Sequence, residues 1–349
     1  MNLHYPAEWE KQKAIWLAFP HNTQNWTGKN RDEIFAFYYE LIGICARFQP
    51  VNVLVPEDFA LPALQKTIFS QAAFKPKFIP MQTDDVWIRD YGPFFVFNDN
   101  GVKKIVKFQF NAWGAKFPPW ENDEQIPFQI AKKKRLAVKE FPYIFEGGAI
   151  EVNDDGLGIT TLPCLVGKNR NHPKDIKHVE FAIKEALGLK DLLVLPEGLA
   201  GDHTDGHIDN AARFVSRNRI AMAWEDDQSK ENFLPLQRNK VILETWIKRH
   251  YGSQAQVDTV QIPTQKKWEG NTLPASYMNF IFLNGALVYP KYEEKFDKKA
   301  EAYFKKVFPN REIIGIDCSA VIREGGSLHC ISKQENESFG AKSPRDSSK

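Results

Sequence analysis

The polar segment GDHTDGHIDN, residues 201–210, holds the densest group of side chains that could take part in chemistry. Asp205, His207 and Asp209 are spaced by two, so they would share one face of a β-strand. Burying two carboxylates and an imidazole on one face costs free energy that a structural role alone does not explain. We therefore predict functional roles for His207 and Asp209, whereas a polar turn ahead of the strand is an alternative interpretation for His203 and Asp205.

A second group of charged side chains surrounds Trp87 in the segment TDDVWIRDYGPFFV, residues 83–96. Asp90 beside an arginine could form a structural ion pair, but carboxylates beside an aromatic ring also describe a pocket for a cationic ligand. Trp113 in FNAWGAKF adds another aromatic ring, and Glu146 precedes two glycines that let the backbone approach another group closely. This combination indicates a site for a cation.

Cys330 lies near the C-terminal end in GGSLHCISKQ, a segment that we interpret as a short strand. Its thiol could be a buried filler, a metal ligand or a nucleophile. Asp90, Glu146, His207 and Cys330 each stand near a glycine at the beginning of a strand unit. If such units form a ring, their beginnings converge. Three carboxylates, a histidine and a cysteine suit nucleophilic attack on a bound cation better than metal binding.

Repeated groups of predicted elements would position these side chains. Residues 148–196, 207–263 and 278–317 each have the order strand, strand, helix and strand, and the first of these helices is expected to end at Gly188. A further unit begins with GPFFVFN and KKIVKFQFN.

The first unit has the strand KAIWLAFP, a helix over residues 32–48 and the strand VNVLVP, but it lacks a hairpin partner. The segment SLHCIS, residues 327–332, could supply that strand and close a ring. The repetition favours a closed, propeller-like α/β array over an open doubly wound sheet.

The composition is typical of a globular protein, with 43% hydrophobic and 26% charged residues among 349. A net charge of +2 gives no argument for nucleic acid or membrane partners, and no apolar run approaches the roughly 20 residues of a membrane helix. Four widely spaced cysteines without a CxxC pair, and no visible secretory signal, favour a reducing, cytoplasmic setting. We expect one domain over residues 1–339 and a frayed tail over 340–349.

Five motifs carry a specific resemblance: WIRDYGPFFV, FNAWGAK, FEGGAIEV, TDGHIDNAARFV and GGSLHCISKQ. Together they resemble, in order, the motifs of the agmatine deiminase and Porphyromonas-type (bacterial-type) peptidylarginine deiminase family. The N-terminal segment YPAEWEKQKAIWLAFP extends the resemblance beyond residues 83–334. The resemblance implies the pentein fold of the guanidino-group-modifying superfamily, a five-bladed α/β propeller of ββαβ-type repeats. This fold agrees with the repeats found above.

The same resemblance implies a role for each candidate residue. Cys330 would be the nucleophile that attacks the guanidinium carbon, and His207 the general acid and base. Asp90 and Asp209 would hold the guanidinium nitrogens, while Glu146 would support the histidine. The remaining substrate contacts would come from residues along the alkyl chain and near its distal end: Trp87, Trp113 and Asp205.

The expected reaction is hydrolytic deimination through a covalent Cys330 thiouronium intermediate, without a cofactor or a metal. Agmatine and water would give N-carbamoylputrescine and ammonia. Two departures bear on the substrate, because DHTDGHIDN stands where agmatine deiminases typically have a sequence close to DETNGHVDN, and EGGSLHC stands where GGGNIHC is frequent. Peptidylarginine or another arginine derivative therefore stays an alternative substrate.

Two other functional classes also fit parts of this sequence. His207 and Asp209, with His250 or His329, could be the ligands of an Fe(II) oxygenase. That interpretation leaves Cys330 and two carboxylates unused. A non-catalytic pentein relative could bind a guanidino compound, but such a protein has no use for a nucleophile. The expected partner is a small guanidino molecule. The sequence leaves the oligomeric state open, with a homodimer as one assembly that it allows.

Overall fold

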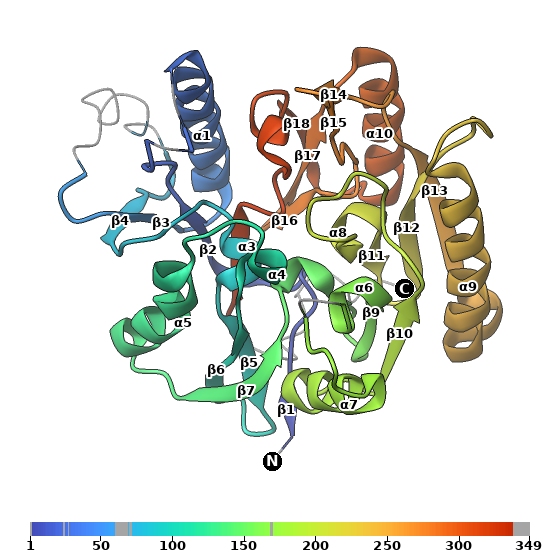
Figure 1. Ribbon diagram of the computed structural model, residues 1–349, viewed down its shortest axis with the longest axis horizontal. Helices are drawn as coiled ribbons and strands as arrows, with labels where there is room; N and C mark the ends of the chain where they lie inside the picture. The colour runs from blue at the N-terminus through green and yellow to red at the C-terminus, as the bar shows by residue number, and fades with distance from the viewer. Residues whose placement is uncertain are drawn as a thin grey trace.

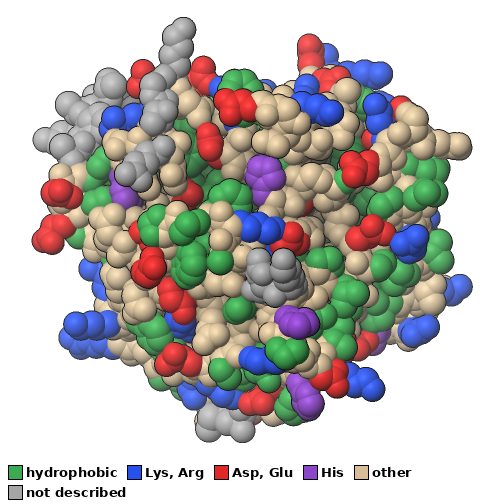
Figure 2. Space-filling view, viewed as in Figure 1, with side chains coloured by type: hydrophobic (Ala, Val, Ile, Leu, Met, Phe, Trp, Pro, Cys, Tyr) green, Lys and Arg blue, Asp and Glu red, His purple; other side chains and the backbone are tan. Residues whose placement is uncertain are grey.

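The computed structural model of this chain describes residues 2–23, 25–26, 28–59, 69, 72–167 and 170–337. The tail expected over residues 340–349 lies outside the described residues. Among the helices that are described, none combines the length and the apolar character needed to cross a membrane. On the face shown in Figure 2, acidic and basic side chains are interspersed wherever residues are coloured by type, as expected for a net charge of +2.

Within the described residues, five sheets of three or four strands make up the α/β architecture (Figure 1). In the first sheet, β19 (Ser332–Asn336) is followed by β2 (Gln12–Ala18), β3 (Val51–Val55) and β4 (Lys77–Pro80). The second contains β1 (Leu3–His4), β5 (Phe94–Asn98), β6 (Lys103–Gln109) and β7 (Val138–Ile144). The other three are β8 (Glu151–Val152), β9 (Leu157–Thr161) and β10 (Asp191–Leu195); β11 (Ala212–Ser216), β12 (Arg219–Trp224) and β13 (Gln256–Gln261); and β16 (Ile281–Leu283), β17 (Ala286–Lys291) and β18 (Glu312–Asp317). A small hairpin joins β14 (Lys267–Trp268) to β15 (Asn271–Thr272).

Each of the five sheets contains an antiparallel pair followed by a parallel pair, as in β8–β9–β10 and β11–β12–β13. A parallel pair needs a crossover, and a long helix lies in that position along the chain. These helices are α1 (Gly28–Phe48), α5 (Glu121–Lys134), α7 (Ile176–Leu187), α9 (Phe233–Tyr251) and α10 (Glu294–Val307). The sheets therefore have the order strand, strand, helix and strand that the sequence predicted.

The long helices lie at the periphery in Figure 1, and short helical turns lie nearer the middle. The short helices labelled there are α3 (Ile88–Tyr91), α4 (Ala112–Ala115), α6 (Leu162–Leu165) and α8 (Ile208–Ala211). The chain also has the single turns η1 (Gly147–Ala149), η2 (Gly252–Gln254), which directly follows the peripheral helix α9, and η3 (Val321–Glu324). Buried apolar side chains fill the space between long helices and sheets, as Leu236 and Leu243 of α9 do beside Phe214 of β11. The short helices that precede these strands, such as α8 before β11, are therefore attached to well-packed elements.

Local signals explain the helix predicted to end at Gly188. The Asp175 carboxylate accepts a hydrogen bond from the Lys177 backbone N–H at 2.9 Å and caps the N-terminus of α7. Gly188 follows the last turn with φ of +69°, a conformation that glycine adopts without steric cost. The prediction of this helix and of its end is confirmed.

The strand predicted over residues 205–209 is wrong. Asp205 and Gly206 have φ of +74° and +106°, so the chain turns there, and Ile208–Ala211 form the single turn α8 before β11. The Asp202 carboxylate stabilises this turn by accepting hydrogen bonds from the backbone N–H of His207 and the side-chain amide of Asn210. The spacing by two therefore does not place these side chains on one face of a strand.

The strand predicted to join the first unit is present but begins five residues later than predicted. Residues 328–331 form a turn, and β19 pairs antiparallel with β2, with Ser332 opposite Leu17. The polar strand SKQEN is buried because its side chains have polar partners, such as Glu335 with the Trp16 indole at 3.1 Å. Cys330 thus lies on a turn ahead of β19, not on the strand itself.

Candidate active site

A cavity of about 470 Å³ brings the predicted cysteine together with predicted carboxylate and aromatic residues. Its wall includes Trp87, Asp90, Trp113 and Cys330, together with polar side chains such as His203. A volume of several hundred Å³ is typical of pockets for small molecules. Gly326 is needed in this wall, because a Cβ there would lie 2.3 Å from the Trp87 indole.

Three of the predicted residues surround one glycine. A Cβ added at Gly148 would lie 2.5 Å from Nδ1 of His207, 2.8 Å from Oδ1 of Asp90 and 3.1 Å from Oδ2 of Asp209. The absence of a side chain at this position lets the imidazole and both carboxylates approach one another. The turn η1, which begins directly after Glu146, places Gly148 there.

Asp90 is fixed by donors at both carboxylate oxygens. The Gly148 backbone N–H donates to Oδ1 at 2.8 Å, and the Trp113 indole N–H donates to Oδ2 at 2.9 Å. Burial raises the pKa of Asp90 to about 7, and the nearby charge of Glu146 adds to this effect. The carboxyl group can therefore change its ionisation near neutral pH.

A left-handed turn presents Trp113 to Asp90. Four successive residues have positive φ: Ala112, Trp113, Gly114 and Ala115. For residues other than glycine this conformation costs roughly 1–2 kcal/mol each. The Asn111 side chain stabilises the turn by accepting a hydrogen bond from the Gly114 N–H at 2.9 Å. Backbone strain of this kind is concentrated at functional sites.

His207 is buried and is held between two acids. Its Nδ1 lies 3.7 Å from Oδ1 of Asp90, and its Nε2 lies 4.0 Å from Oε2 of Glu146. Neither ring nitrogen has a hydrogen-bond partner within the described part of the chain. Burial, with the charges of Arg170 and Lys116, lowers the pKa of His207 well below its usual value. The imidazole is therefore neutral at physiological pH and free to accept a proton.

Glu146 is oriented by Arg170, which sequence reasoning missed. The Arg170 Nε donates to Oε1 of Glu146 at 2.7 Å, and both side chains are buried. The second oxygen, Oε2, faces His207 and accepts no hydrogen bond from the residues described. A buried, unpaired carboxylate oxygen beside a histidine can bind a proton-carrying group.

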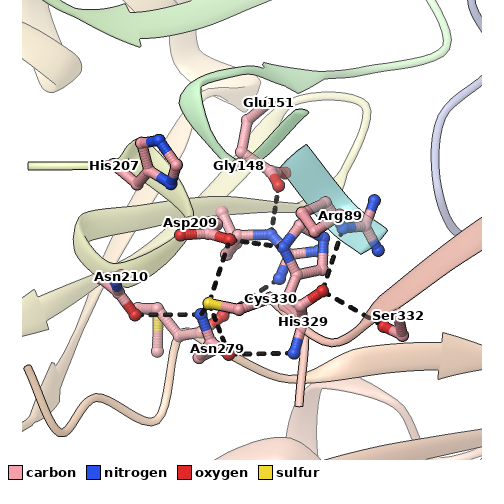
Figure 3. Close-up of polar contacts among 12 residues, drawn as sticks. Arg89, Gly148, Glu151, His207, Asp209, Asn210, Asn279, His329, Cys330 and Ser332 are labelled. Carbon is pink, nitrogen blue, oxygen red and sulfur yellow. Dashed lines mark hydrogen bonds and ion pairs between the residues drawn. The ribbon is translucent and has the colours of Figure 1, made fainter. Parts of the chain in front are cut away.

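Asp209 and Cys330 lie side by side (Figure 3), and Oδ2 of Asp209 is 3.9 Å from the Cys330 sulfur. Burial and the charge of Asp90 raise the pKa of Asp209 well above its usual value, although the charge of Arg213 lowers it in part. Burial together with Asp209 and Asp90 raises the pKa of the Cys330 thiol well above its usual value. Before a cation binds, the thiol is therefore protonated.

Two residues that contact this pair were not predicted for this purpose. The Asn279 side-chain amide donates to the Cys330 sulfur at 3.2 Å and to Oδ1 of Asn210 at 2.9 Å. His329, a possible iron ligand on sequence grounds, instead lies with its Nδ1 2.7 Å from Oδ2 of Asp209. A polar residue inside the apolar run SYMNFIFL was the one available sequence signal for Asn279.

Asp205 does not lie on the cavity wall. One of its carboxylate oxygens pairs with Lys116 and the other with Arg170. Since Arg170 also holds Glu146, Asp205 connects the turn before His207 to that glutamate.

The ligand set considered for iron is not assembled. Among the described residues, the group of potential ligands close enough to hold a metal is Glu8, Glu151 and His329, which includes neither His207 nor Asp209. Arg213 already pairs with both glutamates of that group. His250 lies on α9, where it pairs with Asp191 at 3.0 Å.

Comparisons with known proteins find relatives that match nearly the whole chain. Residues 4–335 match the model of a family described as Porphyromonas-type peptidyl-arginine deiminase. The agmatine deiminase of Ectopseudomonas mendocina is 31% identical over 363 residues, which cover 97% of this chain and 96% of that protein. A cysteine-to-serine variant of the C. jejuni agmatine deiminase, solved with substrate bound, has a TM-score of 0.86 at 31% identity over 97% of each chain. The agmatine deiminase of Enterococcus faecalis has a TM-score of 0.85 at 26% identity over 96% of each chain.

Proposed function

The chain belongs to the Porphyromonas-type peptidyl-arginine deiminase family, and on this premise we propose that it hydrolyses agmatine to N-carbamoylputrescine and ammonia. It is a hydrolase that acts on carbon–nitrogen bonds of linear amidines. The solved relatives support the α/β pentein fold. We further propose that its five sheets are the blades of one propeller and that residues 1–339 are a single catalytic domain.

The proposal rests on the convergence of a thiol, an imidazole and carboxylates around Gly148 and Cys330. A guanidinium ion stays protonated in water because its pKa exceeds about 12, and its delocalised charge resists attack. Asp90 and Asp209 supply carboxylates that would pair with its nitrogens and hold its carbon near the Cys330 sulfur. Trp87 and Trp113 would cover the alkyl chain.

Binding of the cation would prepare the nucleophile. The positive charge of a guanidinium beside Cys330 favours the thiolate, just as the two acids disfavour it now. Neutral His207 can accept the thiol proton. Sulfur then attacks the guanidinium carbon, His207 delivers its proton to the leaving nitrogen, and ammonia departs. An S-alkylthiouronium remains on Cys330.

Water would complete the reaction at the same centre. Neutral His207 accepts a proton from the attacking water, with Oε2 of Glu146 available to compensate the imidazolium charge. The carbon–sulfur bond then breaks as the carbon–oxygen double bond forms, and the remaining hydroxyl proton leaves to solvent. His207 returns its proton to the thiolate, and the neutral ureido product leaves. Every proton taken by His207 is returned within one cycle, so no cofactor is required.

Acidic groups in the cavity wall support agmatine as the substrate. Asp85 and Glu324 line the same cavity as Cys330, and within the described part of the chain neither forms an ion pair. Burial raises the pKa of Asp85 to about 6, with the charge of Glu324 contributing. A distal ammonium would relieve this repulsion, whereas the carboxylate of free arginine would increase it. Lys116, the cation in the wall, is already engaged by Asp205.

The decisive experiment replaces the nucleophile. Cys330→Ala should abolish ammonia release from agmatine while leaving guanidine binding measurable by calorimetry, because both carboxylates remain. Cys45→Ala is the matched control, since Cys45 is equally buried but lies in α1. Turnover near the wild-type level in Cys330→Ala would show that the mechanism is wrong. A panel of agmatine, arginine, arginine peptides and methylarginines, assayed for ammonia and ureido product, tests the substrate.

A further inference from the structure

His329 connects the active site to a second buried carboxylate. Its Nδ1 lies 2.7 Å from Oδ2 of Asp209, and its Nε2 lies 2.8 Å from Oε2 of Glu8. All three side chains are buried. Figure 3 shows His329 beside Cys330, with the imidazole directed towards Asp209. The imidazole therefore spans two acids, of which one faces the catalytic thiol.

The donors around Glu8 show which end of this bridge is ionised. Oε2 of Glu8 also accepts a hydrogen bond from Arg213 at 2.6 Å, and Oε1 accepts one from the Phe282 N–H at 3.0 Å. Such a set of donors stabilises a carboxylate. Burial would raise the pKa of Glu8, but Arg213 and His329 lower it below its usual value. Glu8 thus accepts the N–H of His329 at Nε2.

The other end of the bridge must then hold a proton on Asp209. A neutral imidazole has one N–H and one acceptor nitrogen. With Nε2–H directed at Glu8, Nδ1 accepts, and its 2.7 Å contact with Oδ2 requires a proton on that oxygen. The pKa shifts of both groups agree with a proton on Asp209 and a neutral His329. Burial and Asp90 raise the pKa of Asp209, while burial, Arg213 and Arg89 lower the pKa of His329. One proton is shared by Asp209 and His329.

We propose that His329 is a positioning residue that takes this proton when the guanidinium binds, so that Asp209 becomes a carboxylate without releasing a proton to solvent. The inference rests on the proposed function, because it needs a guanidinium at Asp209. In the step, the Oδ2–H bond of Asp209 breaks and the Nδ1–H bond of His329 forms. The electron pair stays on Asp209, and the imidazolium lies between the carboxylates of Asp209 and Glu8.

The charges that face this bridge make the transfer reversible. The substrate cation would favour ionised Asp209, and Glu8 would compensate the imidazolium at hydrogen-bond distance. Arg213 and Arg89 oppose the imidazolium, so the proton returns to Asp209 when the cation leaves. Without His329, Asp209 would exchange this proton with solvent each time that substrate binds.

Proton counting tests the proposal directly. In a Cys330→Ala background, agmatine binding is measured by calorimetry at pH 6 in two buffers of different ionisation enthalpy. His329→Gln added to this background should release about one proton more than the parent, because glutamine can bond to both acids but cannot store a proton. Asp90 contributes equally to both proteins. His250→Gln is the matched control, as His250 lies on α9. Equal proton release in all three proteins would overturn the proposal.

A second measurement avoids any change at residue 329. In Cys330→Ala, the ¹⁵N shifts of His329 should report a neutral ring with hydrogen on Nε2 before agmatine is added and an imidazolium afterwards. A ring that stays neutral when agmatine binds refutes the proton transfer even if the wild type releases ammonia. If the wild type releases no ammonia from agmatine while His329 of Cys330→Ala still becomes charged on binding, the proposed function is refuted instead.

Discussion

Replacing Trp113 with phenylalanine removes the indole N–H that Asp90 accepts while keeping an aromatic ring in the cavity wall. In the native protein this N–H donates to Oδ2 of Asp90 at 2.9 Å, and the Gly148 N–H serves the other oxygen. The indole hydrogen bond stabilises the ionised carboxylate, so it lowers a pKa that burial has raised to about 7. Its loss should therefore raise the pKa of Asp90 further.

The size of this shift follows from the energy of such a bond. A hydrogen bond to a charged group contributes about 1.5–3 kcal/mol, and about 1.4 kcal/mol corresponds to one pKa unit. Trp113→Phe should thus raise the pKa of Asp90 by roughly one to two units. Asp90 must be ionised to hold a guanidinium, so the acid limb of kcat/KM should move to higher pH by the same amount. At pH 6 the loss in kcat/KM should be roughly 10- to 100-fold.

The assay is ammonia release from agmatine between pH 5 and pH 10. The difference between Trp113→Phe and the wild type should shrink as pH rises, because Asp90 is ionised in both proteins well above their pKa values. Trp224→Phe is the matched control, since the Trp224 indole donates at 2.8 Å to the exposed Asp226. A loss of equal size at every pH would show that Trp113 acts by contact alone and would refute the electrostatic reasoning.

The remaining predictions concern Gly148, around which three site residues pack, and Glu335 in the buried strand β19. Gly148→Ala should lower kcat/KM by roughly 100-fold, because its methyl group would displace His207, whereas Gly43→Ala, with open space around it in α1, should stabilise the protein by about 0.5–1 kcal/mol. An active Gly148→Ala enzyme contradicts this. Glu335→Gln should destabilise by about 3 kcal/mol in urea unfolding at pH 7. Burial raises the pKa of Glu335, but the charges of Lys103 and Lys134 outweigh this and lower it. The deficit should therefore begin to shrink below about pH 4 and disappear only below the folded-state pKa, and a deficit independent of pH contradicts the pairing.

Elements with local signals could be predicted from the sequence. Apolar runs separated by turn residues predicted the hairpins, and amphipathic spacing that ends at Gly188 predicted α7. These signals depend on residues only a few positions apart, so the local sequence is sufficient to predict the elements. The repeated order of elements followed from the same local patterns.

The strand predictions for two segments were wrong because alternation of polar and apolar residues also occurs in turns. Asp205 and Gly206 adopt positive φ in a turn, which the spacing of three polar residues does not reveal. In the C-terminal segment, the alternating stretch is a turn and the polar stretch is the strand. β19 is buried only because β2, more than 300 residues earlier, supplies its partner strand and Trp16 bonds to Glu335.

The sequence by itself determined which side chains could do chemistry: a thiol, an imidazole and several carboxylates, most of them within a few residues of a glycine. Their types indicated nucleophilic attack on a bound cation, and the resemblance of five motifs to a known family implied deimination of a guanidinium. The tertiary structure decided how these groups are fixed and ionised, because the pKa of a buried group sums the effects of neighbours from the whole chain. Glu8 reaches Asp209 through His329 across 321 and 120 residues of sequence, and no local pattern encodes contacts at such separations.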